Sequence, residues 1–165
     1  VDKANVLETS RLWRETVQAM EKDYPEVEVS YEFVDAVAMR LVQWPNSYDV
    51  LITENLFGDI LTDEASVISG SMGLMPSASL GSDIGLFEPI HGSYPQATGK
   101  NIANPMATVL SAAMMFENFG LQNEGKAIRE VVNKALNEGI VTEDLSDGGK
   151  SYGTNEVGDW LAENL

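Results

Sequence analysis

Apolar residues recur at helical spacing along much of this chain. In residues 5–23 they return every three or four positions among charged side chains, which predicts an amphipathic helix that ends at Tyr24-Pro25. The same spacing predicts helices at 36–42, 56–69, 107–119, 123–137 and 154–164. We expect Asn104 to cap the helix at 107–119, with Pro105 at its first position, and Thr154 to cap the last helix.

Three other stretches have the pattern of β-strands. Apolar and polar residues alternate over 27–33, which predicts a strand with one buried face. A short apolar run at 50–53 predicts a buried strand, and 86–90 predicts a further short one. Since strands alternate with helices, we expect an α/β fold. An average sheet has roughly five or six strands, so we also expect part of this sheet to lie outside the chain.

Loops separate these elements at three places. Residues 70–81 are small and glycine-containing, which is typical of a hinge or of a boundary between lobes. Residues 91–105 form a polar segment that leads into the predicted helix at 107–119. Residues 147–149, Asp-Gly-Gly, predict a turn.

Composition and charge exclude several classes of function. The 165 residues suffice for a domain with a sizeable core. A net charge of −16 argues against nucleic acid or an anionic membrane surface as a partner. The absence of cysteine excludes a thiolate zinc site and a cysteine nucleophile, and it is compatible with a cytoplasmic protein. No apolar run is long enough to span a membrane.

Acidic residues supply the first candidate site. Asp59 and Asp63 lie four residues apart on a predicted helix and therefore share a face, and Asp35 follows a predicted strand. Carboxylate oxygens are the ligands that Mg²⁺ and Mn²⁺ prefer. The pattern alone leaves a metal site and a solvated helix face as equal alternatives. Lys3 is a lone lysine, a type that is usually solvated but that can act as a base near a divalent cation.

The polar segment at 91–105 supplies the second candidate site. It contains His91, the only histidine, and it precedes a predicted helix N-terminus, where phosphate groups bind readily. A long surface loop is the alternative interpretation. The chain contains no G-x-G-x-x-G motif, so the Rossmann fingerprint is absent.

Four dense segments, residues 1–8, 55–66, 70–80 and 88–105, together resemble the isocitrate/isopropylmalate dehydrogenase family of β-decarboxylating dehydrogenases. The resemblance covers essentially the whole chain and is strongest to the members that oxidise 3-isopropylmalate in leucine biosynthesis. It implies the non-Rossmann α/β fold of that family, of which this chain would be the C-terminal portion. Residues 1–69 would belong to the metal-binding and dimer-forming lobe, and residues 70–165 to the cofactor-binding lobe.

The resemblance also implies roles for individual residues. Asp35, Asp59 and Asp63 match ligands of Mg²⁺ or Mn²⁺, and Lys3 matches the catalytic lysine, which deprotonates the substrate hydroxyl. Lys3, Val6 and Asp35 would contact the substrate. The expected NAD contacts are Asn5, Glu88, His91, Gly92, Ser93, Gln96, Asn101 and Asn104. A homodimer is implied, in which one subunit gives the lysine and the Asp35-type acid and the other gives the Asp59/Asp63 pair.

Two departures from the family pattern change what we expect. Gln96 stands where members that use NAD usually carry an aspartate, so we expect NAD with weaker discrimination against a 2′-phosphate. The family's substrate-binding arginines and its tyrosine proton donor would precede Val1, so we expect the 165 residues to be inactive by themselves. A related enzyme for isocitrate, homoisocitrate or tartrate, and a non-catalytic dimerising fragment, remain as alternatives.

Overall fold

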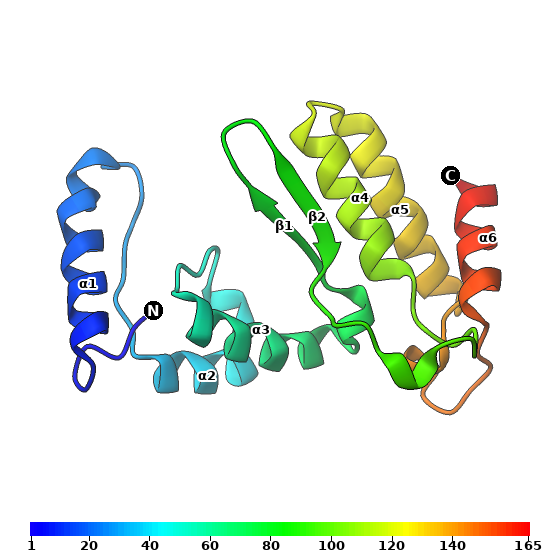
Figure 1. The fold of residues 1–165 in the computed structure, drawn as a ribbon, viewed down its shortest axis with the longest axis horizontal. Coiled ribbons are helices and arrows are strands. Elements are labelled where there is room, and N and C mark those ends of the chain that lie inside the picture. The colour runs from blue at the N-terminus through cyan, green and yellow to red at the C-terminus, as the bar shows by residue number, and fades with distance from the viewer. The chain divides into compact units, whose positions relative to one another are not determined.

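The computed structural model describes all 165 residues and divides them into two compact units, Val1–Ile68 and Ser69–Leu165 (Figure 1). Each unit has a core of its own and is described by itself below. None of the helices combines the length and the apolar character that a membrane span requires.

Three helices form most of the first unit: α1 (Glu8–Met20), α2 (Val34–Gln43) and α3 (Asn55–Ser69), the last of which ends one residue beyond the unit. Its core is small and lies between α2 and α3. Val37 and Leu41 of α2 are buried together with Leu61 of α3, and Val1, Val34, Ala38, Tyr48 and Leu51 pack against them. All three helices were predicted from the periodicity of the sequence, with small shifts at their ends.

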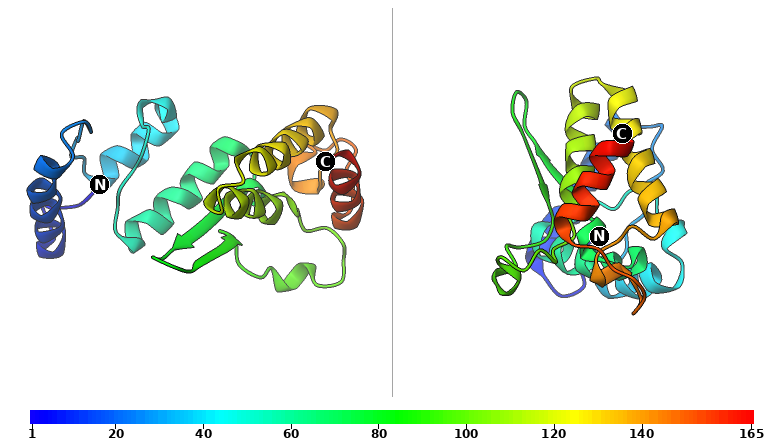
Figure 2. Two further views of the ribbon diagram at one scale, coloured as in Figure 1. Left: turned by 90° about the horizontal axis from the view of Figure 1, so that it is seen from above. Right: turned by 90° about the vertical axis from the view of Figure 1, so that its right-hand side faces the viewer.

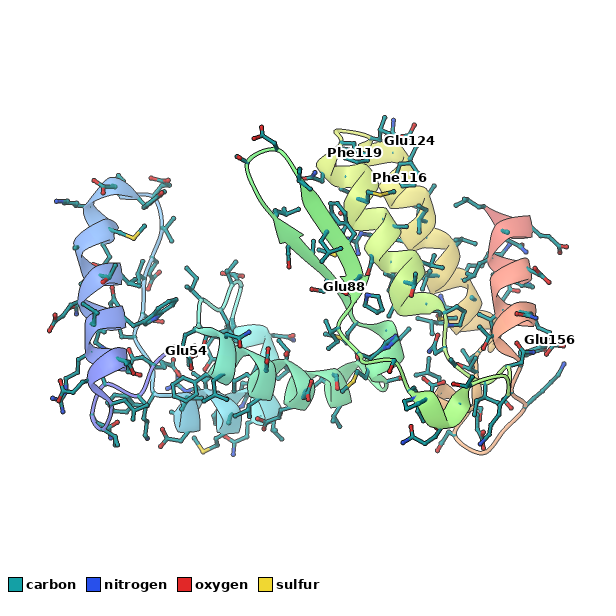
Figure 3. The ribbon with its side chains drawn as sticks, in the orientation of Figure 1. Glu54, Glu88, Phe116, Phe119, Glu124 and Glu156 are labelled. Carbon is teal, nitrogen blue, oxygen red and sulfur yellow. The ribbon has the colours of Figure 1, made fainter.

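Glu54 explains why α3 begins where it does. Its carboxylate accepts hydrogen bonds from the backbone N–H groups of Leu56 and Phe57, at 2.8 and 3.0 Å. These N–H groups have no partner inside the helix, and a negative charge at a helix N-terminus is also favourable for the helix dipole. Figure 3 shows Glu54 beside the first turn of α3.

Two predicted strands of this unit are wrong. Residues 27–32 and 50–53 lie outside any strand or helix, and only an isolated parallel bridge joins Asp2 to Phe33. Val27 is 54% exposed and Val50 is 79% exposed, although both were expected to be buried. The reason is that a strand needs a neighbour for its backbone groups, and no segment of this unit supplies one.

The second unit packs helices on a hairpin. Strand β1 (Pro76–Leu80) pairs antiparallel with β2 (Gly85–Pro89), so that Pro76 lies opposite Pro89 and Leu80 opposite Gly85. Helix α4 (Met106–Asn118) contacts both strands, α5 (Gln122–Glu138) runs back along α4, and α6 (Thr154–Asn164) packs on α5 (Figures 1 and 2). The core consists of Met106, Val131, Val132, Ala135, Val141, Val157 and Leu161.

The structure confirms the predicted helices of this unit and the strand at 86–90, whereas β1 lies within the segment 70–81 that was expected to be a hinge or a boundary between lobes. Serine and glycine around residues 76–81 hide this strand in the sequence, and its pairing with β2 stabilises it. The predicted start of α4 is one residue early: Pro105 is at the N-cap position and not the first helical residue, while Oδ1 of Asn104 accepts from the N–H of Met106 at 3.0 Å. The predicted cap Thr154 is wrong: Gly153 precedes α6, and its N–H donates to Glu156 at 2.8 Å (Figure 3).

Candidate functional site

The first unit brings Lys3 and Asp35 together across 32 positions of sequence. The ammonium group of Lys3 donates a hydrogen bond to the carboxylate of Asp35, which lies in the first turn of α2. The Lys3 side chain is only 23% exposed, whereas that of Asp35 is 68% exposed. This hydrogen bond holds the pKa of Asp35 below its usual value. The pair therefore presents a fixed cation and an accessible carboxylate side by side.

Asp2 holds the backbone next to Lys3 in place. Its N–H donates to the carbonyl of Glu32 at 3.1 Å, and its carbonyl accepts from the N–H of Val34 at 2.8 Å. Its carboxylate is buried and accepts two hydrogen bonds from Arg14, at 2.7 and 2.9 Å. Burial raises the pKa of Asp2, but the hydrogen bonds from Arg14 and from the N–H of Ala4 outweigh it, so the pKa lies below its usual value.

Asn5 and Val6 follow Lys3 in a tight turn. The carbonyl of Lys3 accepts hydrogen bonds from the N–H groups of Val6 and Leu7, both at 2.9 Å. Both predicted contact residues are exposed, and Val6 is 63% exposed. Their side chains are therefore accessible beside Lys3, where the resemblance expects substrate and nicotinamide.

Asp59 and Asp63 lie on α3 with exposed side chains, four residues apart on one face. The structure does not bring them to Asp35: the chain holds no group of three or more acidic, histidine or cysteine side chains that could bind a metal ion. Within one chain the three predicted ligands thus form two separate parts, the Lys3–Asp35 pair and the Asp59/Asp63 pair. Their role as metal ligands remains a prediction.

The second unit contains a cavity of about 770 Å³, within the range of small-molecule sites. His91, Gly92, Ser93 and Asn104 line it, as expected for residues that share one ligand. Sequence reasoning did not anticipate the other walls, which come from residues 71–73, from Tyr94 and from Glu143 and Asp144. The His91 ring nitrogen Nδ1 lies 3.0 Å from the carbonyl oxygen of Gly92.

Three other predicted cofactor residues of the second unit do not line this cavity. Glu88 is exposed on β2, opposite Ser77 in the register (Figure 3), and Gln96 is exposed in a short 3₁₀ turn. Asn101 adopts a left-handed backbone with φ of 56° and fastens the loop to α6, since its Oδ1 accepts from the N–H of Asn155 at 3.0 Å. Asn101 lines a separate cavity of about 360 Å³.

Asp144 is the polar centre of the 770 Å³ cavity wall. Its carboxylate accepts hydrogen bonds from the hydroxyls of Ser71 and Thr142 and from Nδ2 of Asn104, the last at 3.1 Å. Burial raises the pKa of Asp144, but these hydrogen bonds outweigh it and hold the pKa below its usual value. No local motif distinguishes Asp144 from the other acids of the sequence. Thr142 is 2 positions away, but Ser71 and Asn104 are 73 and 40 positions away.

The structure thus combines a lysine–aspartate pair, an acidic helix face and a cavity of about 770 Å³. Residues 1–161 match the isocitrate/isopropylmalate dehydrogenase family, and the chain is a member of that family. Its relatives include the 3-isopropylmalate dehydrogenases of Bacteroides fragilis, 56% identical, and of Oceanobacillus iheyensis, 55% identical, each over the full length of this chain. The chain spans about half the length of these relatives, 47% and 46% respectively.

Solved structures confirm the predicted fold. Isocitrate dehydrogenase from Methylococcus capsulatus superposes with a TM-score of 0.94 and 39% identity, covering 99% of this chain and 48% of that one. A β-decarboxylating dehydrogenase from Thermococcus kodakarensis superposes with a TM-score of 0.85 and 40% identity, covering 98% of this chain and 47% of that one. The fold is therefore that of the family, present here in part.

Proposed function

We propose that this chain is the C-terminal portion of a 3-isopropylmalate dehydrogenase, which converts 3-isopropylmalate and NAD to 2-oxo-isocaproate, CO₂ and NADH in leucine biosynthesis. The observation that carries the proposal is the level of identity. The chain is 56% identical to a 3-isopropylmalate dehydrogenase, against 39% to the isocitrate dehydrogenase whose fold it shares. These values favour the isopropylmalate reaction over its isocitrate counterpart.

The acidic residues fit a hard divalent cation. Asp35, Asp59 and Asp63 offer exposed carboxylate oxygens, which Mg²⁺ and Mn²⁺ prefer, and the ammonium group of Lys3 already orients Asp35. When bound, such a cation polarises the substrate hydroxyl and stabilises the negative charge that develops as CO₂ leaves. These three residues would hold it.

Lys3 has the chemistry required of the proton-transfer group. Oxidation of the hydroxyl releases a proton as the hydride leaves for the nicotinamide of NAD, and Lys3 in its neutral amine form could accept that proton next to the substrate. The Lys3 side chain is partly buried and forms an ion pair with Asp35, so its nitrogen is held beside the Asp35 carboxylate. Val6, exposed beside Lys3, offers an apolar surface for the isopropyl group.

The cavity of the second unit suits the adenosine end of NAD. Its volume of about 770 Å³ accommodates a nucleoside, and neither lysine nor arginine is among its lining residues. This supports NAD over NADP, even though Gln96 lacks the charge that the family usually carries.

The face of α3 that bears the acids supports a homodimer. Leu56, Ile60, Asp63 and Val67 succeed one another at helical spacing and share one face. The three apolar members are 63%, 55% and 77% exposed in this chain. A second copy seated on this face would bury them and bring Asp63 to the edge of the partner's site, which supports active sites shared between subunits.

The proposal is tested with a chimera. This chain replaces the matching segment of the Bacteroides fragilis enzyme, and the product is assayed for NADH formation from 3-isopropylmalate and, separately, from isocitrate and tartrate. We expect turnover of 3-isopropylmalate that needs Mg²⁺ or Mn²⁺. Preference for another substrate would assign the chain to a sister activity.

We also propose that the 165 residues alone do not catalyse the reaction, because half of the length of the active relatives is absent from them. Turnover by the purified 165-residue chain would contradict this. We expect a folded dimer without turnover, and size-exclusion chromatography measures the oligomeric state directly.

A further inference from the structure

We infer that Arg14 is a positioning residue for Lys3, which it reaches through Asp2 and Phe33. The inference rests on the proposed function, since it concerns the lysine of that reaction. Arg14 lies on α1, 11 positions beyond Lys3, among charged residues that the sequence presents as an ordinary solvated helix face. The structure instead gives it two partners around Lys3, Asp2 and Phe33.

The first link is to the backbone that carries Lys3. Arg14 binds the carboxylate of Asp2 through two nitrogens, with Nε 2.7 Å from Oδ2 and Nη2 2.9 Å from Oδ1. Asp2 is 1% exposed, and its backbone is bonded on both sides of Phe33, to Glu32 and to Val34. A bidentate pair fixes both position and rotation of the group it holds. The backbone and the side chain of Asp2, the residue directly before Lys3, are therefore both held in place.

The second link is the ring of Phe33. The guanidinium carbon of Arg14 lies 5.1 Å from its centroid, and the ammonium nitrogen of Lys3 lies 5.3 Å from the same centroid. Both distances are within the range of cation–π attraction. One ring thus contacts the positioning arginine and the lysine, and it precedes by two residues the aspartate to which Lys3 bonds.

The third link is electrostatic. Asp2 is a carboxylate adjacent in sequence to Lys3 and competes with Asp35 for its ammonium group. Arg14 occupies both oxygens of Asp2, while the N–H of Ala4 adds a further bond at 2.9 Å. A compensated carboxylate attracts a second cation weakly. Arg14 therefore leaves Lys3 to Asp35, and displacement of a reacting group by about 1 Å costs up to about 100-fold in rate.

The test is a double-mutant cycle on kcat in the full-length enzyme. Arg14→Lys retains the charge but loses the bidentate geometry, and Lys3→Ala removes the group on which Arg14 acts. We expect Arg14→Lys to lower kcat by about 10- to 100-fold with the KM for NAD unchanged, and to lower it no further in the Lys3→Ala background. A merely structural role would lower kcat equally in both backgrounds, and that result overturns the inference.

A matched control and a second variant keep the test decisive. Arg129→Lys changes an equivalent bidentate pair, with Glu117 at 2.7 and 3.0 Å on helices of the second unit, and should leave kcat unchanged. If Arg14→Lys does not fold, Phe33→Leu removes the shared ring and leaves the Asp2–Arg14 pair intact. Its kcat should also fall, and only when Lys3 is present. An undiminished kcat in Phe33→Leu overturns the inference.

The outcome separates this inference from the proposed function. If Lys3→Ala alone retains full kcat, the role of the lysine in the proposed reaction is wrong, and the role of Arg14 with it. If Lys3→Ala loses kcat while Arg14→Lys and Phe33→Leu retain it, the proposed function stands and only the positioning role is wrong.

Discussion

The side-chain amide of Asn104 is bonded by the protein at both ends: its Oδ1 accepts from the N–H of Met106 at 3.0 Å, and its Nδ2 donates to Asp144 at 3.1 Å. Asn104 therefore accepts from the first N–H group of α4 and, at the same time, connects the helix to the wall of the cavity. A ligand in the cavity meets Asn104 as part of a fixed surface. Asp144 is the group that joins the parts of this surface, since it also binds Ser71 and Thr142.

Asp144 should make stability depend on pH. Its pKa is lower in the folded protein than the usual 3.8 of an unfolded chain, so its contribution is fully present above that value and is lost as the pH falls through the folded pKa. Asp144→Asn should cost about 1–3 kcal/mol near neutral pH and flatten the acid limb of the stability profile. Urea unfolding of both proteins between about pH 3 and about pH 7 measures this. Parallel profiles would contradict it.

Local periodicity predicted the helices well because the signal for a helix lies within the segment that folds. The strands were harder, because pairing is not local. The alternation in 27–33 predicted a strand, yet this unit provides no partner for it, while the serine-rich β1 is a strand because β2 lies beside it. A hydrophobic pattern describes what a segment can bury, and the rest of the chain decides whether it does.

The candidate site shows the same division. Asp59 and Asp63 could be placed on one face from their spacing alone, whereas the meeting of Lys3 and Asp35 depends on the bridge between Asp2 and Phe33. Resemblance to a family supplied the expectation that these residues act together. Arg14 and Asp144 were missed because their partners lie on other elements, and neither belongs to a recognisable motif.

The acids of α3 should be needed for metal dependence. Asp59→Asn or Asp63→Asn in the full-length enzyme removes a charged oxygen ligand, and we expect kcat to fall about 100-fold or more together with the loss of activation by Mn²⁺. Steady-state assays over a range of Mn²⁺ concentration measure both. Glu64→Gln, one position along the same helix, is the matched control and should remain active. Unchanged kinetics of the aspartate variants at saturating metal would remove the metal assignment.

The apolar face of α3 should hold the dimer together. Val67 is 77% exposed in this chain, and Val67→Glu would place a charge in the proposed interface without changing Asp59 or Asp63. We expect the full-length enzyme to become a monomer in size-exclusion chromatography and to lose activity in parallel. Phe119→Glu, at an aromatic residue after α4 that is 64% exposed, serves as the control and should remain dimeric (Figure 3). A dimeric Val67→Glu variant would exclude this face.

Two helical glycines should respond in opposite ways to alanine. A Cβ on Gly125 of α5 would lie 2.6 Å from Cγ of Glu117 and 3.0 Å from the carbonyl oxygen of Ala113, both on α4. Glu117 has little freedom to move, because Arg129 binds both its oxygens. The gain in helix propensity is therefore outweighed by overpacking, and we expect Gly125→Ala to destabilise the protein by about 1–3 kcal/mol.

Gly158 is the matched case, because a Cβ there meets nothing within 4 Å on helix α6. Gly158→Ala should stabilise the protein by about 0.5–1 kcal/mol through helix propensity alone. Thermal unfolding of the two variants beside the unmodified protein gives both signs in one experiment. The contrast between them isolates the α4–α5 contact, since the two substitutions are chemically identical. Stabilisation by Gly125→Ala would mean that α4 and α5 approach less closely than the structure shows.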